Sequence, residues 1–306
     1  MTRSKRVLVT GASGYIGSLL CNKILKSDYG LSLLDTKVHD NFGLGNIIGQ
    51  SEVNIFEGDI RDRNILSSAV TGIDTLIHLA GISDGRMGKI NPSLTREINY
   101  ESFDNMLEIA KGSGVKRVLF ASTFGVYGNS YVQKLDESLK INPEDIYSET
   151  KALCEALLVK HNSDEFTTAS LRIAMVYGLS PSMRYEFLVN NLSQTAKVKG
   201  ELVIMGGSQK RPQIHVQDIT DYFLKLISVD ANLISGEAFN AVGENPTILD
   251  IAKIIKNHLP NTEIKILPSR PNEVSFELDG RKILQKIGIE PSYSISEGVL
   301  EILNNS

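Results

Sequence analysis

The fold is decided by residues 5–25, KRVLVTGASGYIGSLLCNKIL, which form an apolar strand pattern, a glycine-rich turn and a helical pattern. Gly11, Gly14 and Gly17 stand in the turn. Glycine adopts backbone conformations closed to other residues, and it lets backbone N–H groups approach a pyrophosphate closely. The N-terminus of the helix adds partial positive charge at the same point. The spacing G-x-x-G-x-x-G between a strand and a helix therefore predicts a dinucleotide-binding turn. The residues among the glycines that we expect to contact the dinucleotide are Ser13, Tyr15 and Ile16.

Short apolar runs alternate with longer helical patterns through the first half of the chain. The predicted strands are 7–10, 31–35, 53–57, 75–79, 118–121 and 168–173. The predicted helices between them are 15–26, 63–70, 92–112 and 147–161. The strand runs are continuously apolar, which is typical of strands covered on both faces. This order predicts an α/β fold with a doubly wound parallel sheet.

The regular alternation of apolar runs and helical patterns ends after Arg172. Residues 180–210 are irregular apart from a helix expected at 185–197. Further helices are expected at 216–229, 248–258 and 281–287, and further strands at 237–242 and 263–267. We expect a dinucleotide-binding domain over 1–173, with segments of about 212–243 returning to it. Residues 174–211 and 244–306 would then form a smaller, partly discontinuous α/β substrate lobe beside a cleft.

Two acidic residues follow predicted strands. Asp35 ends the second strand, 18 positions after Gly17, where a carboxylate accepts both hydroxyls of an adenosine ribose and repels a 2′-phosphate. Although Lys37 lies close, Asp35 therefore predicts NAD rather than NADP. Asp59 and Ile60 follow the third strand and either hold the adenine or only turn the chain.

Tyr147 and Lys151 stand four residues apart at the start of the helical pattern YSETKALCEALL. Positions i and i+4 share one face of a helix, so the phenol and the ammonium can point into one site. The unperturbed pKa of tyrosine is about 10, and a neighbouring cation favours the phenolate. This spacing is common by chance, but its place after a dinucleotide-binding turn predicts an acid–base pair.

Composition excludes several classes of function. The chain of 306 residues carries 32 basic and 36 acidic side chains, a net charge of −4, which is unlike a nucleic-acid-binding protein. Two cysteines, Cys21 and Cys154, are too few for a disulfide framework or a metal cluster. No apolar run reaches the length of a membrane span. We therefore expect a cytoplasmic protein with no metal, nucleic-acid or membrane partner.

The motifs and their order resemble the extended short-chain dehydrogenase/reductases, the NAD-dependent epimerase/dehydratase group that contains UDP-galactose 4-epimerase and other nucleotide-sugar enzymes. The segments that carry the resemblance are GASGYIG, Asp35, GDI, HLAG, ASTFGVYG, YSETK, LRIAMVYG, RPQIHVQDI, residues 270–272 and LQKIGIEPSYSISEGV. They cover essentially the whole chain. The resemblance implies a Rossmann fold, NAD, a nucleotide-sugar substrate, and a homodimer formed through the helices near 92–112 and 147–161.

Catalytic roles follow from the same resemblance. Thr123 would hydrogen-bond the reacting sugar oxygen, and the adjacent Ser122 could share this role. Tyr147 would act as general acid and base. Lys151 would bind the nicotinamide ribose and lower the pKa of Tyr147.

Binding roles are implied as well. Leu79, Ala80 and Gly81 would line the cofactor, and Asn99, which also counts among the expected cofactor-binding residues, would brace the active-site helix. Arg211 and Arg270 would grip the diphosphate, for which guanidinium geometry is suited, although each could equally be an ordinary surface residue. His215 is expected to cap or pack rather than to catalyse.

Epimerases, dehydrogenases and reductases all use the Thr–Tyr–Lys set, so this set does not identify the reaction. Two departures from the group's pattern bear on the reaction and on the ligand. Phe124–Gly125 stands where the 4,6-dehydratases carry an acidic pair, and the glutamate usual near this point in decarboxylases is absent. Met175 replaces the asparagine of the motif LRxxN, so the substrate lobe would grip its ligand differently. We expect an epimerase acting at carbon 4. The alternatives are a 4-keto reductase or 4-dehydrogenase, and a non-catalytic NAD-binding sensor, against which the intact set argues.

Overall fold

A computed structural model describes residues 5–37, 42–83, 85–129, 134–269 and 274–305. Its centre is a seven-stranded sheet in the order β11-β7-β5-β4-β1-β2-β3, parallel throughout. The strands are β1 (Arg6–Thr10), β2 (Gly30–Asp35), β3 (Asn54–Glu57), β4 (Thr75–His78), β5 (Arg117–Thr123), β7 (Thr167–Ile173) and β11 (Glu237–Ala241). The predicted doubly wound parallel sheet is thereby confirmed. The strand order reverses between β1 and β4, where such sheets bind ligands at the carboxyl ends of their strands.

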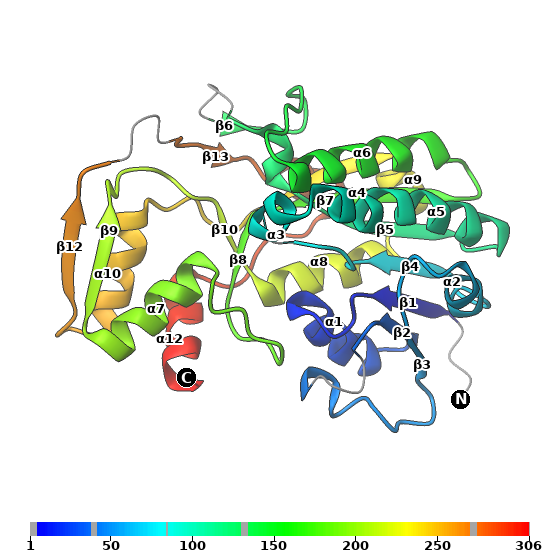
Figure 1. Ribbon diagram of the computed structural model, residues 1–306, viewed down its shortest axis with the longest axis horizontal. Coiled ribbons are helices and arrows are strands. Elements are labelled where there is room, and N and C mark those ends of the chain that lie inside the picture. Colours follow the sequence, from blue (N-terminus) through cyan, green and yellow to red (C-terminus); the bar gives the residue numbers. More distant parts are fainter. Residues whose placement is uncertain (1–4, 38–41, 84, 130–133, 270–273, 306) are drawn as a thin grey trace.

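Helices cover both faces of this sheet (Figure 1). On one face, α1 (Tyr15–Leu25) and α8 (Val216–Ser228) share a hydrophobic cluster with the alternate β1 residues Val7 and Val9. The cluster on the other face contains Leu8 and side chains from α2 (Arg63–Ala69), α5 (Ser102–Gly112) and α6 (Ile146–His161). Because both faces are packed, β1 and β7 are buried almost throughout, which explains their continuous apolar runs.

The helix predicted over 92–112 is present over those residues but is not α-helical throughout. It consists of α4 (Pro92–Arg96), a π-helical turn at Glu97–Glu101, and α5. A short α3 (Gly85–Ile90) precedes it. The π turn contains Asn99, whose buried amide bonds both backbone groups of Ile82: Ile82 N donates to Oδ1 at 2.7 Å, and Nδ2 donates to Ile82 O at 2.9 Å. The wider turn thus brings a side chain to the loop after β4, a common use of π turns near functional sites.

A second group of elements lies at one end of the molecule, away from the large sheet (Figure 1). It contains α7 (Leu188–Lys199), β9 (Glu201–Met205), α10 (Ile248–His258), β12 (Glu263–Leu267) and α12 (Ile295–Asn305). β9 and β12 pair in parallel, and the group has its own hydrophobic cluster. The described remainder comprises η1 (Phe42–Leu44), η3 (Phe124–Tyr127), β6 (Lys134–Leu135), β8 (Met175–Tyr177), β10 (Gln213–His215), α9 (Ala231–Ile234), β13 (Glu277–Leu278) and α11 (Arg281–Ile287).

One expectation for this group was wrong, and a second holds with a shifted start. Residues 180–210 contain strand β9, whose burial alternates as Leu202 and Ile204 face the cluster. The helix expected at 185–197 begins instead at Leu188, because Phe187 is extended and packs edge-on against Tyr15 with ring centroids 5.3 Å apart. The separate cluster supports our division into a dinucleotide domain and a substrate lobe, which stays a proposal.

Candidate active site

A pocket of about 850 Å³ lies at the carboxyl ends of β1, β4, β5 and β7, in the volume range of ligand sites. The glycine turn forms one wall. Gly11 has φ +72°, and a Cβ on it would lie 2.6 Å from Ala80 N; a Cβ on Gly17 would lie 2.1 Å from Gly11 O. The N-cap residue of α1 is Gly14, which has no side chain to cap the helix, so the first N–H groups of α1 are left for an anion. The turn therefore fits a dinucleotide pyrophosphate.

The other residues predicted to bind the cofactor lie around this turn. The pocket lining includes Ser13, Gly14, Tyr15, Ile16, Asp35, Asp59, Ile60, Leu79, Ala80 and Gly81. The Asp35 carboxylate accepts hydrogen bonds from Ser13 N at 3.0 Å and from Lys37 N at 3.2 Å, so the turn and β2 position it together. Asp59 is bound by Arg61, which holds the pKa of its carboxyl below the usual range.

Asn99 does not belong to that lining. Its amide lies behind the wall, bonded to Ile82 and, at 3.3 Å, to Thr150 Oγ1 of α6. It therefore braces the loop after β4 against the helix that carries Tyr147. This agrees with the bracing role expected for Asn99, and its assignment as a cofactor-binding residue stays a prediction.

The four residues predicted to catalyse, Ser122, Thr123, Tyr147 and Lys151, all line the pocket. Thr123 ends β5, while Tyr147 and Lys151 occupy the first two turns of α6, which Asp145 caps by accepting from Ser148 N at 2.8 Å. Lys151 Nζ donates to Ala121 O at 2.8 Å and lies 5.8 Å from the centroid of the Tyr147 ring.

Burial dominates the proton affinities of this pair. It lowers the pKa of Lys151 to about 8 and raises the pKa of Tyr147 to about 12, while the Thr123 hydroxyl acts to lower the latter. We expected the lysine to hold the tyrosine pKa down. In the structure, desolvation outweighs any such effect, because the ammonium is directed to the Ala121 carbonyl.

Two predicted residues are placed differently from expectation. The buried Ser122 hydroxyl donates to Glu155 Oε1 at 2.5 Å, so it is engaged by a carboxylate of α6; Ser122 also lines the pocket, and its contact with the sugar stays a prediction. Arg211 Nη1 donates to the backbone carbonyls of Lys210 and Val274 at 2.9 and 2.6 Å, and Arg211 is not among the residues lining this pocket. Arg270 lies outside the described residues. His215 caps α8 by accepting from Gln217 N, as expected.

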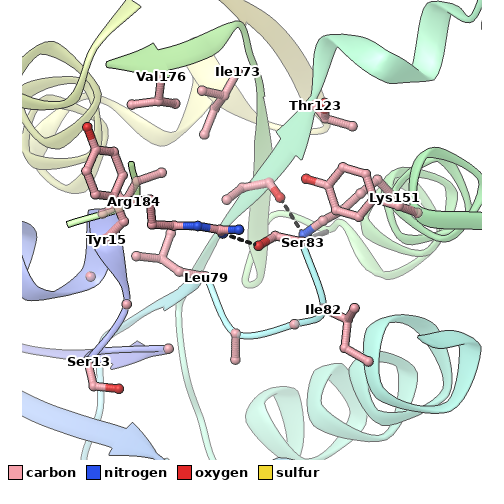
Figure 2. A pocket seen from close by; sticks show the side chains of 18 of the residues that line it. Ser13, Tyr15, Leu79, Ile82, Ser83, Thr123, Lys151, Ile173, Val176 and Arg184 are labelled. Carbon is pink, nitrogen blue, oxygen red and sulfur yellow. Dashed lines mark hydrogen bonds between the residues drawn. The ribbon is translucent and has the colours of Figure 1, made fainter. Parts of the chain in front are cut away.

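Sequence reasoning missed Arg184. Figure 2 shows it reaching across the pocket to Ser83, between Tyr15 on one side and Lys151 on the other. Its Nη1 donates to Ser83 Oγ and its Nε to Glu186 Oε1, both at 2.6 Å, and its guanidinium lies 4.7 Å from the Phe187 ring centroid. Its charge also acts to lower the pKa of Tyr147. The segment after β8 has no periodicity or motif that would have singled it out.

No helix in the described part of the chain is long and apolar enough to cross a membrane. Among the same residues, no group of three or more histidine, cysteine, aspartate or glutamate side chains is placed to hold a metal ion.

Comparison with known proteins matches a model of the NAD dependent epimerase/dehydratase family to residues 7–241. UDP-glucose 4-epimerase of Bacillus subtilis (strain 168) is 24% identical, over 95% of this chain and 94% of its own. UDP-glucuronic acid decarboxylase 1 of Danio rerio is 28% identical, over 96% of this chain and 71% of its own. The UDP-glucuronic acid 4-epimerase of Bacillus cereus, solved in complex with UDP-glucuronic acid and NAD, is 26% identical with a TM-score of 0.86, over 98% of each chain.

Proposed function

The chain belongs to the NAD dependent epimerase/dehydratase family, and from this premise we propose that it is a nucleotide-sugar 4-epimerase working by transient hydride transfer. The observation that carries the proposal is the meeting of Thr123, Tyr147 and Lys151 in one pocket with the dinucleotide turn. When bound, NAD supplies the hydride acceptor. The protein supplies the proton transfer and the orientation of the sugar.

In the proposed reaction, Thr123 Oγ1 hydrogen-bonds the oxygen on carbon 4. Tyr147 takes the proton of that hydroxyl as the carbon loses hydride, and it returns the proton after the sugar has turned its other face. Burial raises the pKa of Tyr147, which makes its phenolate a stronger base but a scarcer one, and a positive charge beside the ring favours the phenolate that the removal step needs. Arg184 acts on Tyr147 in this direction, and Lys151 is the other cation among the described residues of the pocket lining.

Dehydration and decarboxylation are less well supported, although relatives with those activities exist. Phe124 lines the pocket directly after Thr123 and packs against Phe276, with ring centroids 5.5 Å apart. An apolar pair thus occupies the place where an elimination would need an acid. Glu186 is the acidic residue nearest to Arg184 along the chain, and its carboxylate accepts a hydrogen bond from that arginine.

The sugar is suggested by Arg184. A guanidinium in the pocket favours a sugar with an acidic substituent, because charge-assisted hydrogen bonds to carboxylates are strong and geometrically selective. The Bacillus cereus relative binds UDP-glucuronic acid, and we propose a nucleotide-linked hexuronic acid as the substrate class.

The retained cofactor separates the epimerase from its alternatives. We expect denatured protein to release NAD or NADH, since an epimerase regenerates its cofactor in every cycle. A 4-keto reductase or 4-dehydrogenase would exchange cofactor and release none. An NAD-binding sensor would retain NAD but would turn over no sugar nucleotide, and Tyr147→Phe would leave its behaviour unchanged.

The homodimer and the cytoplasmic location stay predictions. Val159 of α6, 62% exposed, supports an interface on the helices expected to dimerise. Light scattering on the purified protein would give the mass of the assembly.

A further inference from the structure

A buried ion pair lies directly behind the proposed catalytic residues. Glu155 of α6 and Arg172 of β7 are joined by three contacts: Arg172 Nη2 donates to Oε2 at 2.7 Å, and Nε reaches both oxygens at 3.1 Å. Both side chains are 8% exposed. A buried pair of this kind costs desolvation free energy and is weak evidence for stability alone, so its placement needs another explanation.

The strand register shows which residue of β5 the Glu155–Arg172 ion pair holds. Ser122 of β5 stands opposite Arg172 of β7, and both bond the same Glu155 carboxylate. One helical turn before Glu155, Lys151 donates to Ala121 O. The helix is therefore fixed to two consecutive residues of β5 by two side chains one turn apart.

The attachment of α6 to β5 fixes the position of the Tyr147 phenol. Tyr147, Lys151 and Glu155 follow one another at intervals of four residues on one face of α6. Because Lys151 bonds Ala121 and Glu155 bonds Ser122, Tyr147 is brought next to Thr123. Sliding the helix by one residue would move the phenol about 1.5 Å along the axis. A displacement of that size is enough to cost a reaction about a hundredfold in rate.

The network also holds the chain on the other side of Thr123. Arg172 Nη1 donates to the Tyr127 hydroxyl at 2.9 Å, and that hydroxyl donates to Asn240 Oδ1 of β11 at 2.8 Å. Tyr127 ends the η3 turn that begins directly after Thr123. Thr123 thus lies between Ser122 and Tyr127, both tied to one ion pair.

We propose that Glu155 is a positioning residue, which through Ser122 and Arg172 fixes the Thr123 hydroxyl against the Tyr147 phenol for proton transfer. The proposal rests on the proposed function, because that pair performs the proton transfer there. Ser122, which the sequence suggested as a second substrate hydroxyl, acts here on the strand and not on the sugar.

Ser122→Ala is the main test, since it leaves the ion pair intact. Thr168→Val is the matched control: Thr168 Oγ1 donates to Leu158 O at 2.8 Å, which ties α6 to the sheet at the end far from the pocket. We expect Ser122→Ala to lower kcat about tenfold with KM within twofold of the wild type. Thr168→Val should lower the melting temperature by a similar amount and leave kcat unchanged.

Two kinetic results would overturn the proposal. An equal kcat in the two variants would make Ser122 a purely structural residue. A raised KM with unchanged kcat in Ser122→Ala would mean that the hydroxyl contacts the sugar. Glu155→Gln should be at least as slow as Ser122→Ala, and the double variant no slower than Glu155→Gln alone. If Glu155→Gln does not fold, the comparison of Ser122→Ala with Thr168→Val still decides.

Hydrogen exchange separates this proposal from the proposed function. Amides of residues 123–128 and 147–151 should lose protection in Ser122→Ala and keep it in Thr168→Val, whether or not a sugar nucleotide reacts. Unchanged protection in both variants would refute the positioning role. A wild-type protein inactive on all sugar nucleotides would refute the proposed function and leave the exchange result to decide the positioning.

Discussion

The Tyr15 hydroxyl donates to the Gly178 carbonyl at 2.5 Å and ties the dinucleotide turn to the segment that carries Arg184. Asn190 Nδ2 donates to the same hydroxyl at 3.2 Å, and Ser182 Oγ donates to Ser13 O at 2.7 Å. The cofactor wall and the substrate wall of the pocket are thus joined by hydrogen bonds. The sequence suggested Tyr15 as a cofactor contact, and the structure adds this second attachment.

Tyr15→Phe should lower the free energy of unfolding by about 1–3 kcal/mol, because the buried Gly178 carbonyl loses its bond to Tyr15 and the Asn190 amide loses one of its acceptors. It should also weaken binding of the sugar nucleotide. Urea unfolding and calorimetric titration measure the two effects. Tyr222→Phe removes a buried phenol hydroxyl from α8, away from this junction, and should leave sugar binding unchanged. An unchanged sugar affinity in Tyr15→Phe would refute the link between the two walls.

Lys151 should make stability rise with pH. Burial depresses its pKa in the folded protein to about 8, below the unfolded value of 10.5. Between these values the unfolded chain binds more protons, so the free energy of unfolding increases with pH. Relative to Lys151→Met, the wild type should gain about 2 kcal/mol between pH 7.5 and pH 10. Urea unfolding of both proteins tests this, and a constant difference would show that the ammonium is not desolvated.

Asp35 should determine the choice of cofactor. Asp35→Ala removes the acceptor for the ribose hydroxyls and the charge that repels a 2′-phosphate. We expect NAD affinity to fall about tenfold and NADP affinity to rise, as a lost charge-assisted hydrogen bond predicts. Calorimetric titration measures both, with the exposed Asp28→Ala as control. Equal losses for NAD and NADP would contradict the assignment.

Arg184 should select acidic sugars. Arg184→Gln should lower kcat/KM for UDP-glucuronic acid at least tenfold more than for UDP-glucose, because it removes a charge-assisted contact that only the acid can make. Arg63→Gln, at an exposed arginine bonded to Asn105, is the control. Equal losses for the two sugars would mean that Arg184 only holds the pocket wall through Ser83.

The sequence was most informative at positions where a physical requirement can be met by only one or a few residue types. The glycine turn, Asp35 and the Tyr147–Lys151 spacing could be recognised because sterics, charge and helix geometry each leave few choices. Arg184 could not, since it lies in an irregular segment whose position depends on Phe187, Tyr15 and the packing of the second lobe. The π turn at Asn99 escaped for a related reason, because its helical pattern does not differ from that of a regular helix.

The role of Ser122 could not be predicted from the sequence either, for a similar reason. The sequence gives two adjacent hydroxyls at the end of β5, and strand alternation indicates that they point to opposite faces. Which face meets the sugar depends on Glu155 and Arg172, which are 33 and 50 positions further along the chain. Only the folded sheet brings them together.

The central claim is epimerisation at carbon 4, and proton NMR of UDP-glucuronic acid and UDP-glucose incubated with the wild-type protein in D₂O tests it most directly. We predict formation of the 4-epimer with the original hydrogen kept on carbon 4, no net accumulation of NADH, and no product with Tyr147→Phe. A free keto sugar with equimolar reduction of added NAD, loss of water or carbon dioxide, or no reaction with any sugar nucleotide would contradict it.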